Sequence, residues 1–414
     1  MFIDNVDEYI RKCEKAAEKE FAALDDVAFF NQKKVLDAFR ENRVAAVHFT
    51  PSTGYGYDDV GRETLCKLFA AVMGAEDAVV SPLIANGTHA LTLALFALLR
   101  PGDTLLSVTG KPYDTLDEVI SGEGNGSLRD FGINFVKTEL TENGEIDFEN
   151  IEIAIKKCKP KVVFIQRSKG YAWRDALSVE KIGEAIAKIK EICADAVFVV
   201  DNCYGEFVQK KEPTEVGADV IVGSLIKNPG GGIAPTGGYI CGKKEYIRSV
   251  AYRLTAPSLG MEVGSCLSGY LPYYQGLFLA PSAVRNALKG SVLAGYALQG
   301  FGFETMPKPG NMPYDIIESI KFDTAEQLVA FCGEIQKASP VDSYVTPLPW
   351  DMPGYDHQVV MAAGAFVQGA SLELSADGAV REPYVAYLQG GLTYEHCKLA
   401  ITEIVKYFNG NNLK

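Results

Sequence analysis

The sequence predicts an α/β fold in which a mainly parallel β-sheet carries helices on both faces. Several short apolar runs lack polar alternation, which is typical of strands buried on both faces. These runs occupy 104–108, 133–136, 162–165, 197–200 and 220–222. Helical patterns, such as 86–99 and 151–158, fall between them. The 414 residues, 47% of them hydrophobic, are enough to bury a large core.

The N-terminal residues predict a helical arm over 1–50. Apolar side chains recur at helical spacing from Val6 to Phe39. A loop rich in Gly, Tyr and Thr follows at 50–57 and leads into a helical pattern over 61–73. Because the arm and the loop expose apolar or aromatic groups without a local partner, we expect both to contact another subunit.

The rest of the chain divides into a large α/β domain over 51–265 and a smaller α+β domain over 266–414. The small domain begins with a hinge rich in Tyr, Pro and Gly at 269–276, and a long helix is predicted over 281–300. A last helical pattern covers 394–408.

Composition excludes several classes of protein. The formal net charge of −13 disfavours nucleic acid and anionic lipid as partners. Nine cysteines without a Cys-x-x-Cys pair, and four histidines far apart in sequence, predict reduced thiols and no metal site. The apolar runs are shorter than the roughly 20 residues of a membrane helix, and the acidic N-terminus lacks an export signal. We therefore expect a cytoplasmic protein without a membrane partner.

In open α/β sheets, ligands bind beyond the carboxyl ends of the strands, so the residues that follow each apolar run are the first candidates. Lys227 lies between the run 220–222 and a glycine-rich turn, where a lysine can carry a cofactor on its amine. Asp201 directly follows the run 197–200, and a buried aspartate needs a cationic or hydrogen-bonding partner. That partner is a protonated ring nitrogen on one interpretation; on the other, Asp201 is a helix cap or a turn residue.

A candidate phosphate site precedes the helical pattern that starts near Thr88. Asn86, Gly87 and Thr88 offer free backbone N–H groups, a glycine and a hydroxyl at a helix start, and Ser224 adds a second hydroxyl. An ordinary capped helix explains the first three residues equally well.

Two further strand ends carry candidate side chains. Tyr113, in a Gly and Pro turn after the run 104–108, is placed to stack on a planar ring and to act as an acid, unless it is an ordinary core or surface tyrosine. Arg167 and Ser168 follow the run 162–165 and offer polar groups to the ring hydroxyl or to the substrate. Arg167 fits a structural ion pair equally well.

Four stretches give this arrangement a family likeness: Thr-Gly-Tyr-Gly-Tyr-Asp-Asp-Val-Gly-Arg, Pro-Tyr-Asp-Thr-Leu, Gln-Arg-Ser-Lys-Gly-Tyr and Lys-Asn-Pro-Gly-Gly-Gly. With them the chain resembles the pyridoxal-phosphate (PLP) enzymes of the aspartate-aminotransferase fold. Within that fold it is similar to the Cys/Met-metabolism carbon–sulfur lyases, in the branch of methionine γ-lyase or "aluminium resistance" proteins. The resemblance covers nearly the whole chain and implies a seven-stranded sheet with PLP as the cofactor.

The resemblance also implies a role for each candidate residue. Lys227 would carry the cofactor as a Schiff base, Asp201 would pair with the ring nitrogen, and Tyr113 would stack on the ring. The phosphate would be held by Asn86, Gly87, Thr88 and Ser224.

Two family arginines are harder to place in this chain. The lyases reach the neighbouring subunit's phosphate with a Tyr-x-Arg pair, where this chain has Tyr55 and Tyr57, with Arg62 five residues further on. They also bind the substrate carboxylate through a small-domain arginine, for which Arg381 is the candidate. The resemblance implies a homodimer or homotetramer with shared active sites.

The implied activity is β- or γ-elimination from a sulfur amino acid. Within the same cofactor class, the alternatives are an aminotransferase and a γ-replacement synthase, and a non-catalytic relative that serves as a binding protein is a further one. A nucleotide-binding protein is suggested only by Gly237 to Lys243, which nearly matches a phosphate-cradling loop but has lysine where a magnesium-binding hydroxyl is needed.

Overall fold

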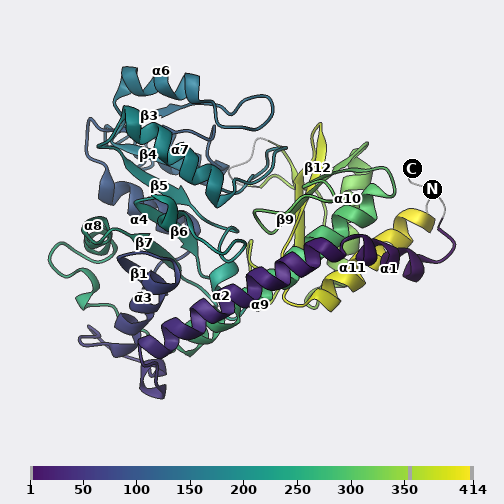
Figure 1. Cartoon of the computed structure of the whole chain (residues 1–414), viewed down its shortest axis with the longest axis horizontal. Helices are drawn as coiled ribbons and strands as arrows, with labels where there is room; N and C mark the ends of the chain where they lie inside the picture. The colour runs from purple at the N-terminus through teal and green to yellow at the C-terminus, as the bar shows by residue number, and fades with distance from the viewer. Residues whose placement is uncertain (1–2, 353–356, 411–414) are drawn as a thin grey trace.

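The computed structural model describes residues 3–352 and 357–410, which form two β-sheets linked by long helices (Figure 1). The larger sheet has seven strands and the smaller sheet has five. Helices α2 (Glu18–Glu41) and α9 (Leu271–Gln299) pack side by side and run from the large sheet toward the small one. The predicted α/β class is confirmed.

The large sheet has the strand order β1-β7-β6-β5-β4-β2-β3. Neighbouring strands from β6 to β3 are parallel, whereas β7 runs antiparallel to both of its neighbours. The sheet is therefore mainly parallel, as the sequence predicts. Its strands are β1 (Asp77–Ser81), β2 (Thr104–Ser107), β3 (Asn134–Lys137), β4 (Val162–Gln166), β5 (Val197–Asp201), β6 (Val220–Ser224) and β7 (Gly238–Gly242).

Alternate residues of these strands contribute to two apolar cores, one on each face of the sheet. Val199 and Val220 belong to the core that contains α4 (Gly87–Leu98), α5 (Asp114–Ser121) and α8 (Lys244–Leu254). Phe198 and Val200 belong to the core of the other face. The helices of that second core are α2, α3 (Val60–Val72), α6 (Phe148–Cys158), α7 (Val179–Ile192) and α9. Burial on both faces explains why the strands read as continuous apolar runs.

The predicted N-terminal arm consists of α1 (Val6–Ala16) and α2. Leu24 and Val35 of α2 are buried in the core that α9 shares, although the two helices are far apart in sequence. Phe29 and Phe30 remain 77% and 44% exposed. The arm thus packs on its own chain with one side and presents aromatic side chains on the other.

The hinge expected at 269–276 is wrong, because α9 already begins at Leu271. Three tyrosines of this stretch are buried, and the hydroxyl of Tyr274 donates to the carbonyl of Gly61 at 2.7 Å. The proline near the start of α9 lies in the first turn, where the missing N–H costs nothing. Aromatic burial therefore stabilises a helix over residues whose Pro and Gly content predicts a break.

The small sheet is antiparallel, with the order β10-β11-β12-β9-β8. Helices α10 (Ala325–Ala338) and α11 (Tyr394–Gly410) share a core with one face. Ile317, Val385 and Tyr387 form a second cluster, with Tyr171 and Tyr204 from the loops of the large sheet packed against it. The strands are β8 (Glu304–Met306), β9 (Ile317–Phe322), β10 (Val359–Ala362), β11 (Ser375–Ala379) and β12 (Tyr384–Gln389). The domain boundaries at 50 and 265 stay a prediction.

Searches of the described residues found few other features that bear on function. Within 3–352 and 357–410, none of the helices is both long and apolar enough to cross a membrane. The same residues contain no group of three or more His, Cys, Asp and Glu side chains that could hold a metal ion. All nine cysteines are free thiols.

Candidate active site

Three neighbouring parallel strands end at one edge of the large sheet. Gln166 ends β4, Asp201 ends β5 and Ser224 ends β6, and Gln166 is the register partner of Asp201. Lys227 immediately precedes the short helix Asn228–Gly230 that follows β6. The fold therefore brings Lys227, Asp201 and Ser224 to the edge where parallel sheets bind ligands.

Lys227 is partly buried among acidic groups. Burial lowers the pKa of Lys227, but Cys203, Tyr204, Asp201 and Tyr113 together raise it above its ordinary value. Burial raises the pKa of Tyr113 and holds that of Cys203 well above its usual range, so both groups are neutral at neutral pH. Lys227 is therefore an ammonium in the cofactor-free chain.

Asp201 is buried, with only 4% of its surface exposed. Burial raises its pKa, while the charge of Lys227 and the backbone N–H of Cys203 lower it. That N–H donates to the Asp201 Oδ1 at 3.1 Å. A carboxylate buried to this extent favours a cationic partner, and a protonated ring nitrogen is such a partner.

An anion cup lies where Ser224 faces the start of α4. The Ser224 Oγ is buried and has no hydrogen-bond partner among the described residues. A Cβ added at Gly87, the first residue of α4, would lie 3.5 Å from the Ser224 Cβ and 3.4 Å from the Cys203 Sγ. An orphaned hydroxyl beside the positive end of a helix fits a phosphate group, which accepts hydrogen bonds from both.

Asn86 also makes the ordinary cap that the sequence left open. Its Oδ1 accepts the backbone N–H of His89 at 2.8 Å, and its side chain is exposed. Thr88, in contrast, directs its Oγ1 to within 3.0 Å of the Tyr113 hydroxyl. The helix start is thus capped by Asn86 and joined to Tyr113 through Thr88.

Tyr113 is fixed from two sides. Its backbone N–H donates to the Gln166 Oε1 at 3.0 Å, and its hydroxyl bonds to Thr88. Gln166 in turn donates through its Nε2 to the Ser168 carbonyl at 3.3 Å. The end of β4 and the start of α4 therefore set the position of the Tyr113 ring.

The assignment of Arg167 to substrate binding is wrong. The side chain is fully buried, and its Nη1 donates to the Asn202 Oδ1 at 2.8 Å and lies 3.7 Å from the Glu212 carboxylate. The Nε and Nη2 donate to the Leu177 carbonyl and to the Gln209 Oε1. With all three nitrogens bound within the chain, Arg167 forms the structural ion pair that the sequence also allowed.

Ser168 does not face the cofactor candidates either. Its hydroxyl donates to the Asp315 Oδ2 at 3.0 Å, just before β9 of the small sheet. The next residue, Lys169, is buried and donates to the carbonyls of Met306 and Ile317 at 3.0 Å and 2.9 Å. The stretch Gln-Arg-Ser-Lys-Gly-Tyr therefore joins the two sheets, and we remove Ser168 from the set of cofactor ligands.

In and beside the loop at 53–57, the two tyrosines Tyr55 and Tyr57 have surroundings that differ from those of Arg62. The two tyrosine rings stack at 5.3 Å and are 69% and 60% exposed. Arg62 is buried and donates through its Nη1 to the carbonyls of Gly56 and Gly264, both at 2.8 Å. Arg62 therefore fastens the loop within its own chain, while the two tyrosines face outward.

Arg381 lies in the turn between β11 and β12 and is exposed. Among the described residues, no carboxylate forms an ion pair with its guanidinium. Arg381 lowers the pKa of Tyr387, whose net shift is upward because of burial and the nearby Asp377. Tyr387 donates to the carbonyl of Tyr171 at 2.6 Å, so Arg381 lies on the side of the small sheet that meets the strand-end loops.

Sequence reasoning missed Gln166 and Tyr204. Gln166 could have been predicted from the rule that ligands bind beyond strand ends, since it directly follows the run 162–165. Tyr204 could not, because its place depends on a left-handed backbone with a φ of 68°.

The stretch from Gly237 to Lys243 is not a phosphate loop. Residues 238–242 form β7, which lies between β1 and β6 in the large sheet. The Lys243 ammonium pairs with the Asp219 carboxylate at 2.7 Å. The nucleotide-binding alternative therefore loses the sequence feature that suggested it.

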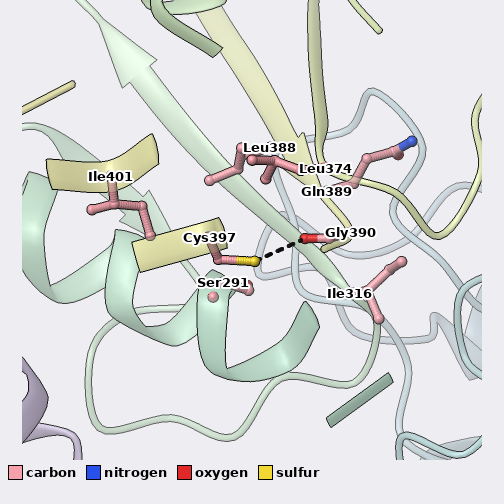
Figure 2. Close-up of a pocket in the computed structure, with 9 residues that line it drawn as sticks. Ser291, Ile316, Leu374, Leu388, Gln389, Gly390, Cys397 and Ile401 are labelled. Carbon is pink, nitrogen blue, oxygen red and sulfur yellow. Dashed lines mark hydrogen bonds between the residues drawn. The ribbon is translucent and has the colours of Figure 1, made fainter. Parts of the chain in front are cut away.

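A small hollow between α9, α11 and the small sheet contains none of the candidate residues (Figure 2). Its lining is mostly apolar, and the Cys397 Sγ faces the Gly390 carbonyl at 3.8 Å. A Cβ added at Gly391 would lie 2.1 Å from that sulfur. Such tight packing is typical of the apolar core, here that of the small sheet.

The fold and the strand-end residues define an α/β protein with a lysine-centred candidate site. The chain belongs to the methionine gamma-lyase family, whose model matches residues 6–409. An uncharacterized protein of Bacillus subtilis, YnbB, is 49% identical over 405 residues, which is 96% of each chain.

Two solved structures of similar chains agree closely in shape. One is a carbon–sulfur lyase involved in aluminium resistance from Clostridium novyi, 49% identical, with a TM-score of 0.94 over 98% of this chain and 96% of that one. The other, from Listeria monocytogenes, is provisionally named a cystathionine β-lyase involved in aluminium resistance and is 50% identical, with a TM-score of 0.94 over 96% and 98%. A pyridoxal-5'-phosphate dependent protein of Escherichia coli, YhfS, shares the fold at 15% identity, with a TM-score of 0.63 over 93% and 97%.

Proposed function

We propose that the protein is a PLP-dependent carbon–sulfur lyase that acts by β- or γ-elimination on a sulfur amino acid. The observation that carries this proposal is the placement of Lys227 and Asp201 at adjacent strand ends, within electrostatic reach of each other and beside the anion cup of Ser224 and α4. Membership of the methionine gamma-lyase family supports it, as does the carbon–sulfur lyase of Clostridium novyi.

The residues present fit PLP. Lys227 would bond to the cofactor aldehyde, Asp201 would pair with the ring nitrogen, and Tyr113 would stack on the ring. The phosphate would be held by the Ser224 hydroxyl, the first N–H groups of α4 and the Thr88 hydroxyl. When bound, PLP supplies an electron sink that makes the substrate Cα proton acidic.

The chain's own groups would move the protons. Lys227, as a free amine, would accept the Cα proton. Tyr113 would donate its phenolic proton to the departing sulfur, since burial keeps that phenol protonated. The Thr88 Oγ1 lies 3.0 Å from the Tyr113 hydroxyl and holds that hydroxyl in place. Arg381, which has no ion-pair partner in the described chain, would bind the substrate carboxylate.

Product analysis tests the proposal directly. The purified protein is offered L-methionine and S-substituted L-cysteines without an amino acceptor, and thiol, ammonia and 2-oxo acid are measured. Elimination gives all three in equal amounts. An oxo acid that forms only when an amino acceptor is added, with no ammonia, would indicate an aminotransferase. A thioether product formed only with an added thiol would indicate a γ-replacement synthase. A protein that binds PLP and forms no product at all would be a non-catalytic relative.

We further propose that each active site is built from two subunits of a homodimer or homotetramer. Tyr55 and Tyr57 project from a loop whose backbone is tied down by Arg62 and by a hydrogen bond from the Gly264 N–H to the Tyr55 carbonyl at 2.9 Å. Two exposed, stacked rings on a fixed loop are costly in water and suit a partner's surface.

Mixed subunits test this arrangement. We expect Tyr55→Phe and Lys227→Ala to be weakly active or inactive alone, and activity to return when the two are unfolded and reassembled together. The recovery approaches a quarter of the wild-type rate if each mixed dimer has one intact site and assembly is random. Tyr344→Phe replaces a similarly exposed tyrosine, 86% exposed, and serves as the matched control. A mixture no more active than its parts would contradict shared sites.

A further inference from the structure

Tyr204 is held in an unusual conformation beside Lys227. Its φ is 68°, in the left-handed region that bulky residues rarely adopt, and Phe207 in the same loop has a φ of 63°. Such backbone angles persist only where the surroundings enforce them, and they gather at functional sites.

Buried polar groups enforce this conformation. Asn202 accepts a hydrogen bond from Arg167 at 2.8 Å and donates to Glu212 at 2.9 Å. Glu212 also accepts the backbone N–H of Phe207 at 2.9 Å. A Cβ added at Gly205 would lie 2.5 Å from the Arg167 side chain. The loop on either side of Tyr204 is therefore locked, which gives the buried ion pair of Arg167 a structural purpose.

The locked loop places the Tyr204 ring against the reacting amine. The Lys227 Nζ lies 4.0 Å from the ring centroid, a distance at which an ammonium is attracted to the π face. The Tyr204 hydroxyl lies 3.4 Å from the Ala370 carbonyl, so the ring is held from its far end as well. The contact is thus built by the fold and not by a flexible surface side chain.

The other groups that act on the Lys227 ammonium are Asp201, Cys203, Glu206 and Tyr113. Burial raises the pKa of Glu206 to about 8, so this carboxyl is mainly neutral at pH 7. Cys203 and Tyr113 are neutral as well. On the proposed function, Asp201 would pair with the ring nitrogen when PLP is bound. Among the side chains of the described residues that act on Lys227, the Tyr204 ring is then left to stabilise the lysine charge.

We propose that Tyr204 is a positioning residue, whose ring face holds the Lys227 ammonium in the cofactor-free chain and again after the released lysine amine has taken up a proton. The inference rests on the proposed function and adds a residue to it. When the Lys227 amine takes the Cα proton, the C–H bond breaks, its electron pair stays on the substrate and an N–H bond forms. The new ammonium stays over the Tyr204 ring.

Labelling of the cofactor-free full chain tests the contact without reference to activity. Lys227 is methylated with formaldehyde and a borane reductant between pH 7 and 10, and its peptide is quantified by mass spectrometry. Loss of the ring lowers the pKa of Lys227 and exposes more free amine at a given pH, so Tyr204→Leu reacts roughly 2- to 30-fold faster. Tyr204→Phe keeps the ring and the wild-type pH profile. Lys188, half exposed on α7, is the internal reference.

Phe207→Leu is the matched control, since it removes an aromatic ring from the same backbone conformation in the same loop. We expect it to leave the Lys227 profile unchanged. Tyr204→Asn tolerates a positive φ and guards against misfolding of the leucine variant. Equal labelling of wild type, Tyr204→Leu and Tyr204→Asn would overturn the proposal, as would a loss of the profile in Tyr204→Phe.

The holoenzyme gives an independent readout. With α-deuterated substrate, Tyr204→Leu raises the isotope effect on kcat and lowers kcat more than it changes KM, and Tyr204→Phe restores both. An unchanged isotope effect would contradict a role in the proton step. If wild type releases no thiol while Tyr204→Leu still labels faster, the proposed function fails and the ring–ammonium contact stands.

Discussion

Lys227→Ala reduces elimination by at least about 10⁴-fold, the upper end of what a positioned proton-transfer group contributes. The variant loses both the covalent bond to the cofactor and the base for the Cα proton. We expect the variant still to bind PLP weakly through the anion cup, because the substitution leaves Ser224 and α4 unchanged. Initial rates of thiol release and cofactor content by absorbance measure the two effects separately.

Lys188→Ala is the control for this change, because it removes an exposed lysine that pairs with Glu184 on the same helix. It should keep full activity and cofactor content. Thermal unfolding of both variants shows whether the fold is retained. A Lys227→Ala protein that retains more than a few per cent of wild-type turnover would contradict the assignment.

Asp201→Asn reduces kcat/KM by about 10²- to 10³-fold, the range found when one preorganised electrostatic partner is removed. Asparagine has nearly the same shape as aspartate but carries no charge. The substitution therefore removes a buried carboxylate, whose pKa is raised by that burial. The folded state should therefore lose little stability while the partner of the ring nitrogen is lost. Steady-state kinetics, together with thermal unfolding, separates the two consequences.

The matched change Asp195→Asn replaces an exposed aspartate just before β5 and should leave both quantities unaltered. An Asp201→Asn variant with wild-type kcat/KM would show that this carboxylate does not act on the ring. A variant that unfolds would point instead to the alternative role of Asp201 as a structural turn residue.

The sequence predicts the central residues of the site because their positions follow from local rules. Asp201, Ser224 and Lys227 lie at or just beyond the ends of apolar runs, and parallel strands bring such ends to one edge. The fold class follows from the same runs, since only a sheet covered on both faces buries them.

The same rule fails for Arg167 and Ser168 because it predicts where a residue lies but not which way its side chain points. Successive side chains at a strand end point to opposite sides. Gln166 points to Tyr113, and Arg167 consequently points to Asn202 and Glu212. Ser168 then turns toward the small sheet. Knowing these directions requires the partners, which lie up to 147 residues away in sequence.

Tyr204 and the start of α9 were beyond sequence reasoning for a related reason. Both depend on distant contacts that override local preference: a buried network fixes the positive φ of Tyr204, and buried tyrosines extend α9 over its prolines and glycines. Local propensity cannot report on such contacts.

We propose that Lys227 bears the cofactor, and trapping with borohydride tests this assignment. The protein as isolated is treated with borohydride, digested and analysed by mass spectrometry for peptides that carry a reduced phosphopyridoxyl group. We expect the group on the peptide that contains Lys227, and we expect it to be absent from Lys227→Ala treated in the same way. A phosphopyridoxyl group on a different lysine, or none after saturation with PLP, would contradict it.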